Sequence, residues 1–274
     1  MENKKFIQIH FSSTAVGQND QLVALLANIG YTGFEEEENN LKAFIAQLDF
    51  NRAELDAVLS IIPAEYTQSL IEEQNWNAQW ESSFEPIVIG NFVGIRAAFH
   101  QPVNDVKHEI IITPKMSFGT GHHATTYMMI EQMEGLDFTD KTVVDFGTGT
   151  AVLAILAEKM GAVAIDAIDY DEWSIENAAE NAAANNCTKI NLVKAETIAT
   201  NKVYDIILAN INLNVIMNNL AAIKVVSKKG GFIVLSGFIK KDEPVMLKML
   251  AEKGIQTQKT LQKGEWICIM AKAN

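Results

Sequence analysis

A strand, a glycine turn and a helix are predicted over residues 142–160, and this combination suits a nucleotide-like ligand. The β-branched run 142–146 ends just before Gly147 and Gly149, and the apolar-periodic segment 152–160 follows. The start of such a helix presents backbone N–H groups, and glycines let a ligand come close to the backbone. The turn therefore predicts a site for a nucleotide-type cofactor.

Two aspartates narrow the identity of that cofactor. Asp145 stands two residues before Gly147, where a carboxylate disfavours a pyrophosphate but can pair with an ammonium group, directly or through water. Asp169 follows a second predicted strand, 163–168, and an acid at that position suits the diol of a ribose. A nucleoside joined to an amino acid meets both demands, so we expect S-adenosylmethionine. A dinucleotide site would carry G-x-G-x-x-G, whereas the spacing here is Gly147-x-Gly149-x-Ala151. Alanine at position 151 adds one methyl group at the helix start and should be tolerated.

A second candidate segment runs from Phe118 to Thr126 and places two glycines among threonines and histidines. This composition predicts a mobile loop that ends at a helix N-terminus, where Thr125 and Thr126 can serve as capping residues. In the functional interpretation the loop folds over the cofactor, and Thr126 binds its amino-acid end. His122 and His123 point in different directions because they are adjacent, and we expect His123 to order the loop or contact the cofactor.

Asn210 is the candidate catalytic residue. The apolar run 205–209 leads directly into it, so its side chain is expected at the carboxyl edge of the sheet, near Asp145 and Asp169. Methyl transfer to nitrogen needs a neutral amine whose lone pair points at the sulfonium methyl group. An amide oxygen that accepts the amine's N–H bonds can fix that alignment. The structural alternative makes Asn210 the cap of a helix that starts at Leu213.

Four segments together resemble the PrmA family, the bacterial ribosomal protein L11 methyltransferases among the class I methyltransferases. They are Phe118-Gly-Thr-Gly-x-His-x-Thr-Thr126, Val144-Asp-Phe-Gly-Thr-Gly149, Ile168-Asp-x-Asp171 and Ala209-Asn-Ile211. The resemblance implies methylation of lysine ε-amines and an N-terminal α-amine on a basic ribosomal protein, L11. It places cofactor contacts on Thr126, Gly147, Asp169 and Asn210, and the turn itself adds Asp145 and Gly149.

The elements that must position these residues form two predicted domains and a connector. Residues 1–60 show a strand, a helix, a hairpin and a helix, which predicts a small α+β domain of ferredoxin-like type that recognises the substrate. Residues 61–118 are expected to form a connector with lead-in strands. Residues 119–274 alternate strands and helices, which predicts an α/β fold, the doubly wound seven-stranded sheet of class I methyltransferases, with a final antiparallel pair.

Charge and composition limit the partners of the chain. Residues 1–118 carry seven lysines and arginines against sixteen aspartates and glutamates, in a chain of net charge −12. An acidic front section repels phosphate backbones and favours a basic partner, so we expect no direct nucleic-acid binding. The two cysteines lack metal-type spacing, so no metal site is expected. With no apolar run of membrane-spanning length and no signal-type core, we expect a cytoplasmic monomer without a membrane segment.

Other functions remain open from the sequence alone. A class I methyltransferase acting on RNA bases or on a glutamine side chain would use the same cofactor. Such enzymes often carry Asn-Pro-Pro-aromatic where this chain has Asn210-Ile-Asn-Leu213. A nicotinamide-dependent oxidoreductase would bind a dinucleotide instead, and a non-catalytic ribosome assembly factor would keep a cofactor pocket without turnover.

Overall fold

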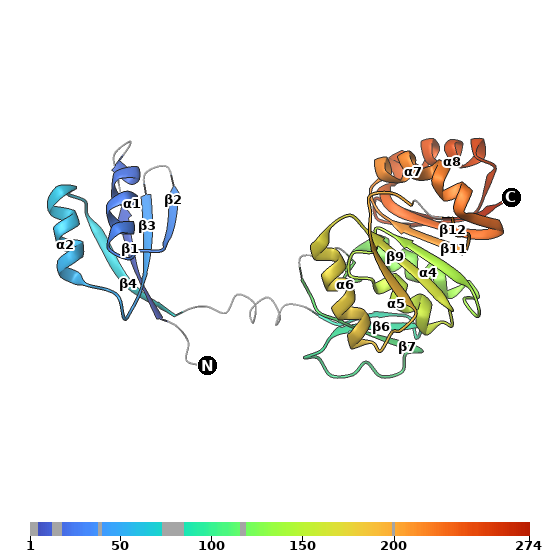
Figure 1. Cartoon of the computed structure of the whole chain (residues 1–274), viewed down its shortest axis with the longest axis horizontal. Coiled ribbons are helices and arrows are strands. Elements are labelled where there is room, and N and C mark those ends of the chain that lie inside the picture. Colours follow the sequence, from blue (N-terminus) through green and yellow to red (C-terminus); the bar gives the residue numbers. More distant parts are fainter. Residues whose placement is uncertain (1–4, 13–17, 38–39, 73–84, 116–118, 199–200) are drawn as a thin grey trace. The chain divides into compact units, whose positions relative to one another are not determined.

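The computed structural model of the chain divides into two compact units, Met1–Ser83 and Phe84–Asn274 (Figure 1). We call them the front unit and the main unit. The structure describes the chain apart from residues 1–4, 13–17, 38–39, 73–84, 116–118 and 199–200. Each unit has a hydrophobic core of its own. None of the described helices is long and apolar enough to cross a membrane.

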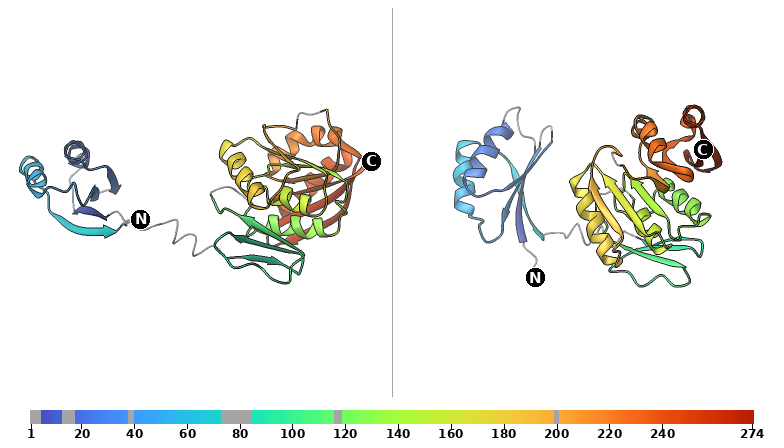
Figure 2. Two further views of the ribbon diagram at one scale, coloured as in Figure 1. Left: turned by 60° about the horizontal axis from the view of Figure 1, so that its bottom comes forward. Right: turned by 45° about the vertical axis from the view of Figure 1, so that its right-hand side comes forward.

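The front unit has the ferredoxin-like arrangement expected from the sequence. Its elements are β1 (Lys5–Ser12), α1 (Gln18–Asn28), β2 (Gly33–Glu37), β3 (Asn40–Ala46), α2 (Arg52–Ile61) and β4 (Tyr66–Glu72). The strands form an antiparallel sheet in the order β2-β3-β1-β4, and both helices cover one of its faces (Figure 2). Since side chains alternate along a strand, Ile7 and Ile9 of β1 point to that face and share a core with Leu22 and Leu55 of the helices.

The boundary between the two units differs from the expected one. The sequence predicted a connector over residues 61–118, but β4 pairs with β1 and completes the front sheet. Three later strands belong to the main unit: β5 (Ile87–Ile89), β6 (Val93–Ala97) and β7 (His108–Ile112). The physical reason is the edge of β1, whose backbone N–H and C=O groups would have no strand partner on that side in a domain that ended at residue 60.

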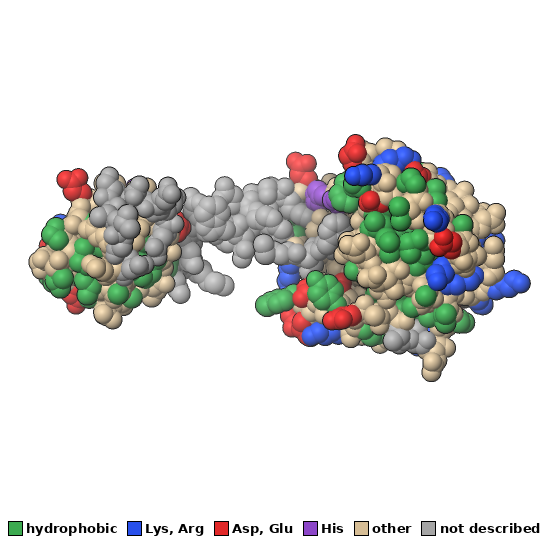
Figure 3. Space-filling view, turned by 90° about the horizontal axis from the view of Figure 1, so that it is seen from above, with side chains coloured by type: hydrophobic (Ala, Val, Ile, Leu, Met, Phe, Trp, Pro, Cys, Tyr) green, Lys and Arg blue, Asp and Glu red, His purple; other side chains and the backbone are tan. Residues whose placement is uncertain are grey.

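The charge of the chain is concentrated in the front unit. Residues 1–83 hold four lysines and arginines against thirteen aspartates and glutamates. On the face of the molecule that Figure 3 shows, the lysine and arginine side chains gather on the main unit. The acidic front section predicted from the sequence therefore coincides with a separately folded unit.

The main unit contains the doubly wound seven-stranded sheet predicted from the alternation of strands and helices. The strands are β8 (Thr142–Phe146), β9 (Ala164–Asp169), β10 (Ile190–Lys194), β11 (Tyr204–Asn210), β12 (Ser227–Ile239), β13 (Ile255–Lys263) and β14 (Trp266–Ala273). Their order is β10-β9-β8-β11-β12-β14-β13, parallel as far as β12, with β14 antiparallel to both of its neighbours. The order of the strands reverses its direction between β8 and β11. In sheets of this kind, ligands bind at the carboxyl ends of the strands on either side of this reversal.

Helices cover both faces of this sheet. They are α4 (Ala124–Glu134), α5 (Val152–Lys159), α6 (Glu172–Ala184), α7 (Leu213–Val226), the short 3-10 helix η1 (Lys240–Asp242) and α8 (Glu243–Glu252) (Figure 1). Alternation along β8 sends Val143 into the core that contains α4 and α5, and sends Val144 into the core that contains α7 and α8. The sheet is therefore buried on both sides, and its carboxyl edge is left for a site.

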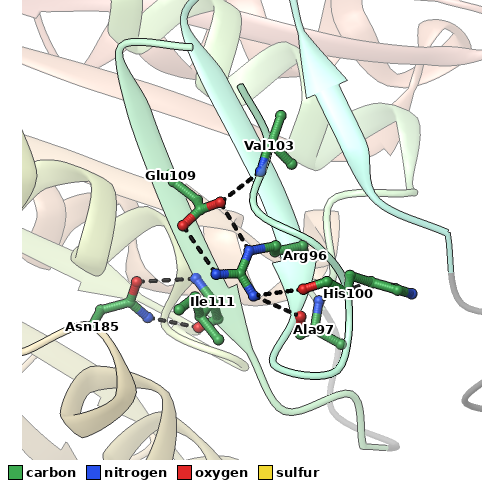
Figure 4. Close-up of polar contacts among 7 residues, drawn as sticks. All are labelled: Arg96, Ala97, His100, Val103, Glu109, Ile111 and Asn185. Carbon is green, nitrogen blue, oxygen red and sulfur yellow. Dashed lines mark hydrogen bonds and ion pairs between the residues drawn. The ribbon is translucent and has the colours of Figure 1, made fainter. Parts of the chain in front are cut away.

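A smaller sheet of the main unit, in the order β5-β6-β7, holds a buried ion pair and is joined to α6 by an amide (Figure 4). Arg96 on β6 is 7% exposed, pairs with Glu109 on β7 at 2.8 Å and also donates to two backbone carbonyls. The Arg96 guanidinium holds the pKa of Glu109 below its usual value. Asn185, which ends α6, accepts a hydrogen bond from the N–H of Ile111 at 3.0 Å and donates one to its carbonyl. The side-chain amide of Asn185 thus links α6 to β7 through two hydrogen bonds to the backbone of Ile111.

Candidate active site

A cavity of about 380 Å³ lies at the carboxyl edge of the parallel strands in the main unit. It brings together segments that follow β8, β9, β10 and β11, the first turns of α6 and α7, and one end of β14. Its lining consists of His123, Phe146, Gly147, Gly149, Asp169, Tyr170, Asp171, Ser174, Ala195, Glu196, Asn210, Ile211, Asn212, Val215, Gly237 and Trp266. A volume in this range, walled by apolar groups with a few polar ones, suits a small organic ligand.

Glycine occupies two positions of the turn between β8 and α5, and both glycines line the cavity. Gly147 has a φ of 76° and Gly149 one of 54°, left-handed conformations that glycine adopts without strain. A Cβ on Gly147 would lie 1.8 Å from Cγ2 of Ile211, so no side chain fits there. The N–H groups of Gly147 and Thr148 donate to the carbonyl of Ile168, at 2.8 and 2.9 Å, and hold the turn against β9.

Asp169 ends β9 and lines the cavity with a side chain that is held in place from two sides. Its Oδ2 accepts a hydrogen bond from the N–H of Gly149 at 2.9 Å, and its Oδ1 accepts one from the N–H of Asp171 at 3.1 Å. Each carboxylate oxygen has a second lone pair, so the group can accept further bonds from hydroxyl groups in the cavity. A preoriented carboxylate of this kind fits a vicinal diol.

Asp145 lies deeper than the sequence suggested and is not part of the cavity lining. Its Oδ2 accepts a hydrogen bond from Oγ1 of Thr148 at 2.7 Å, whereas its Oδ1 is buried and has no hydrogen-bond partner among the described residues. Burial raises the pKa of Asp145 to about 7; the Thr148 hydroxyl and the backbone N–H of Ala154 oppose the increase, and the nearby charge of Asp169 adds to it. An ammonium group bound directly or through a water would supply the missing partner and favour the ionised carboxylate.

Asn210 ends β11 at the cavity wall and is 6% exposed. Its Nδ2 donates to Oγ1 of Thr126 at 3.1 Å, which ties the first turn of α4 to the edge of the sheet. Its Oδ1 is buried and lacks a hydrogen-bond partner in the part of the chain that the structure describes. The alternative role as a helix cap is wrong for this residue, because Asn212 caps α7 by accepting from the N–H of Val215 at 3.1 Å.

The N-terminus of α4 is capped by a different residue from the ones predicted. The sequence suggested Thr125 and Thr126 as caps, but both are buried within the first helical turn, and His123 is the capping residue. Its Nδ1 accepts from the backbone N–H of Thr125 at 3.4 Å. The His123 ring also lines the cavity and meets the ring of Trp266 edge-on, with centroids 4.5 Å apart. Phe118, the first residue of the predicted loop, lies outside the described residues.

Sequence reasoning missed the wall formed by the last strands. Trp266 begins β14, which is antiparallel, so its first residue lies at the edge where the parallel strands end. Gly237 on β12 and Val215 on α7 complete this side of the cavity. No motif marks these three residues, and the only available signal was the prediction of an antiparallel final pair. Among the described residues, no group of histidines, cysteines or acids could hold a metal ion.

Comparisons with known proteins agree with this fold. The family model described as ribosomal protein L11 methyltransferase (PrmA) matches residues 6–274. A ribosomal protein L11 methyltransferase of Porphyromonas gingivalis is 36% identical over 91% of this chain and 89% of its own. One of Chlorobaculum tepidum is 39% identical over 89% of each chain. The crystal structure of a ribosomal protein L11 methylase of Lactobacillus delbrueckii subsp. bulgaricus has a TM-score of 0.65 and 28% identity, and it covers 70% of this chain and 100% of that one. The chain therefore belongs to the PrmA family of ribosomal protein L11 methyltransferases.

Proposed function

We propose that this cavity transfers methyl groups from S-adenosylmethionine to ribosomal protein L11, at lysine ε-amines and at the N-terminal α-amine. The family consists of enzymes that use S-adenosylmethionine, and relatives that match nearly the whole chain are named for L11. The observation that carries the proposal is the buried, unpartnered Oδ1 of Asn210 at the cavity wall. An amide oxygen in that position is a ready acceptor for the N–H of an incoming amine.

The residues around the cavity fit S-adenosylmethionine, which supplies an activated methyl group when it is bound. Asp169 would accept hydrogen bonds from the ribose hydroxyls, and Gly147 and Gly149 would let the ligand lie close to the backbone. Asp145 would balance the ammonium charge. Thr126 and Asn210, which are joined by a hydrogen bond, complete the proposed cofactor contacts at the amino-acid end.

Asn210 would act on the acceptor by orienting it. Its Oδ1 accepts an N–H bond from the amine, while the bond from its Nδ2 to Thr126 fixes the plane of the amide. The amine lone pair is then directed at the methyl group, and orientation of this kind supplies most of the rate enhancement. A lysine amine has a pKa of about 10.4 in water, and burial against the apolar wall that includes Val215 and Trp266 lowers it toward the reactive neutral form.

The remaining features of the proposal concern partners and location. The front unit would recognise the basic substrate, since its own charge is strongly negative. The same charge opposes direct binding to nucleic acid. We further propose that the enzyme acts as a monomer in the cytoplasm.

Intact-mass analysis of ribosomal proteins after incubation with the enzyme and S-adenosylmethionine tests this function. Mass increases of whole methyl groups on L11 are expected. In a parallel reaction with labelled S-adenosylmethionine, label that enters ribosomal RNA instead of protein would overturn the proposal in favour of a base methyltransferase. Asn210→Ala separates an enzyme from an assembly factor. It should abolish transfer, while binding of S-adenosylhomocysteine, which the other contacts of the cavity hold, should be weakened but remain measurable.

A further inference from the structure

A buried threonine ties the glycine turn after β8 to the segment that precedes α4. Residues 119–123 lead into α4, and we call them the α4 loop. Thr150 is 0% exposed, and its Oγ1 donates a hydrogen bond to the backbone carbonyl of Gly119 at 2.7 Å. The turn contributes Gly149 to the cavity wall, and the α4 loop contributes His123. One hydrogen bond therefore joins two segments that both shape the cavity.

This bond continues a buried chain of polar groups that starts on α6. Asn181, which is also 0% exposed, donates from Nδ2 to the backbone carbonyl of Thr150 at 2.9 Å. The Oδ1 of Asn181 accepts a hydrogen bond from the N–H of Thr113 at 2.7 Å. The polypeptide is thus fixed to Asn181 at Thr113 and to Thr150 at Gly119, and the two fixing side chains are bonded to each other.

The α4 loop lies so close to its neighbours that two of its positions require glycine. Gly119 has a φ of 106°, and a Cβ there would lie 2.9 Å from Oγ1 of Thr150. Gly121 has a φ of 93°, and a Cβ there would lie 2.7 Å from Cδ1 of Ile95 on β6. Glycine adopts such positive φ values without strain. The loop is therefore held between the turn on one side and the small sheet on the other.

The α4 loop determines where two residues of the site lie. His123 ends the loop, caps α4 and lines the cavity. Thr126, in the first turn of α4, accepts a hydrogen bond from Nδ2 of Asn210. Thr150 is not part of the cavity lining, so it can act on a ligand only through the segments that it holds.

We propose that Thr150 is a positioning residue for the cofactor, because its hydroxyl group holds the α4 loop where His123 can contact bound S-adenosylmethionine. The proposal rests on one part of the function proposed above, the binding of this cofactor in the cavity, and does not depend on the methyl acceptor. Ordering a loop on binding costs conformational entropy. A hydrogen bond that orders the loop beforehand removes part of this cost and raises the affinity.

Thr150→Val tests the hydroxyl group with a side chain of similar shape. A methyl group would replace the donor that now lies 2.7 Å from the carbonyl oxygen, and even favourable C–H···O contacts are about 3.3 Å long, so the loop must move away. The affinity for S-adenosylhomocysteine, measured by calorimetry, should fall about threefold to tenfold, the effect of one lost hydrogen bond. Thr150→Ser keeps the hydroxyl group and should bind within about twofold of the wild type.

Thr142→Val is the matched control for a purely structural role. Thr142 begins β8 at the end opposite the cavity, and its Oγ1 donates to Oδ2 of Asp205 at 3.0 Å. Both valine variants should be less stable than the wild type in urea denaturation, since each loses a hydrogen bond. Only Thr150→Val should lose affinity for S-adenosylhomocysteine. An equal loss of affinity in Thr142→Val would show that lower stability alone is the cause and would overturn the proposal.

The outcomes separate this inference from the function on which it rests. If the wild type does not bind S-adenosylhomocysteine, the assignment of the cavity fails and the inference fails with it. If the wild type binds and Thr150→Val keeps the same affinity, the cavity stands and the positioning role is wrong.

Gly119→Ala decides the matter if circular dichroism shows that Thr150→Val does not fold. Its Cβ would lie 2.9 Å from Oγ1 of Thr150, so it disturbs the same contact from the loop and leaves the turn intact. Weaker binding of S-adenosylhomocysteine by Gly119→Ala supports the role of Thr150, and an unchanged affinity overturns it.

Discussion

Replacing Asp145 with asparagine should remove a pH dependence from the stability of the apoprotein. Asp145 is 1% exposed, its Oδ1 has no hydrogen-bond partner among the described residues, and burial raises its pKa from the ordinary value of 3.8 to about 7. In the unfolded chain the carboxyl group titrates near its ordinary value. Over the pH range between these two values, the folded protein holds a proton that the unfolded chain has lost.

The sign and size of the effect follow from these two pKa values. A group whose pKa is raised in the folded state contributes stability that is fully present below its unfolded pKa and is lost as the pH rises through its folded pKa. The loss therefore extends from about pH 4 to about pH 7 and, at about 1.4 kcal/mol for each pH unit, reaches about 4 kcal/mol of the free energy of unfolding. Cofactor binding works in the other direction. An ammonium group beside the ionised carboxylate lowers its pKa, so the affinity for S-adenosylhomocysteine should rise over the same range.

Urea denaturation of the apoprotein at about pH 5 and about pH 8 measures this loss, which should be about 3 kcal/mol larger in the wild type than in Asp145→Asn. The comparison between the two proteins removes the contribution of histidines that titrate in the same range. Asp105→Asn, at an exposed loop position, is the matched control and should behave as the wild type. An equal pH dependence in wild type and Asp145→Asn would refute the buried carboxyl group as its source.

Asp169→Ala is expected to weaken the binding of S-adenosylhomocysteine by about 1–3 kcal/mol, as loss of a charged hydrogen-bond acceptor does; calorimetry that finds an unchanged affinity would remove Asp169 from the ribose role. Gly147→Ala should abolish cofactor binding and lower the thermal stability, because its Cβ would lie 1.8 Å from Cγ2 of Ile211. A Gly147→Ala protein that binds the cofactor and unfolds as the wild type does would contradict the tight contact between this turn and Ile211. Asn185→Ala should lower the free energy of unfolding by about 1–3 kcal/mol, since the backbone of Ile111 loses two hydrogen bonds. Denaturation measures this change, and the affinity for S-adenosylhomocysteine should stay constant because Asn185 does not line the cavity.

One part of the site was predictable from the sequence: Gly147, Asp169 and Asn210 line the same cavity because each lies at or just beyond the carboxyl end of a parallel strand. The alternation of apolar strands and helices predicted the doubly wound sheet, and the strand order confirms it. Once the sheet is parallel, the carboxyl ends of β8, β9 and β11 must share one edge. Local sequence pattern and topology were therefore sufficient to bring these residues together.

The same patterns could not predict three further features: backbone conformation, the depth of side chains and the pairing of distant strands. The methyl group of Ala151 fits as expected and is fully buried, but its φ of 62° is left-handed, which costs a residue with a side chain about 1–2 kcal/mol. The position of Asp145 on its strand did not reveal that its carboxylate lies beneath the turn, bonded to Thr148. The segment of β4 was assigned to the connector, because its pairing with β1 depends on contacts between distant parts of the chain.

Two buried oxygens without partners lie on neighbouring strands, Oδ1 of Asp145 on β8 and Oδ1 of Asn210 on β11. Such groups cost about 1–3 kcal/mol each when they stay unpaired, so the apoprotein is less stable than one with paired groups. In the proposed function the amine of the substrate satisfies the oxygen of Asn210, whereas Asp145, which does not line the cavity, acts on the ammonium group of the cofactor through its charge or a bridging water. These protein oxygens are already desolvated and fixed in direction before a ligand binds. Each ligand therefore binds more favourably in the one orientation that points its N–H groups toward them. The polar groups that weaken the folded apoprotein are therefore the ones expected to align the two reactants.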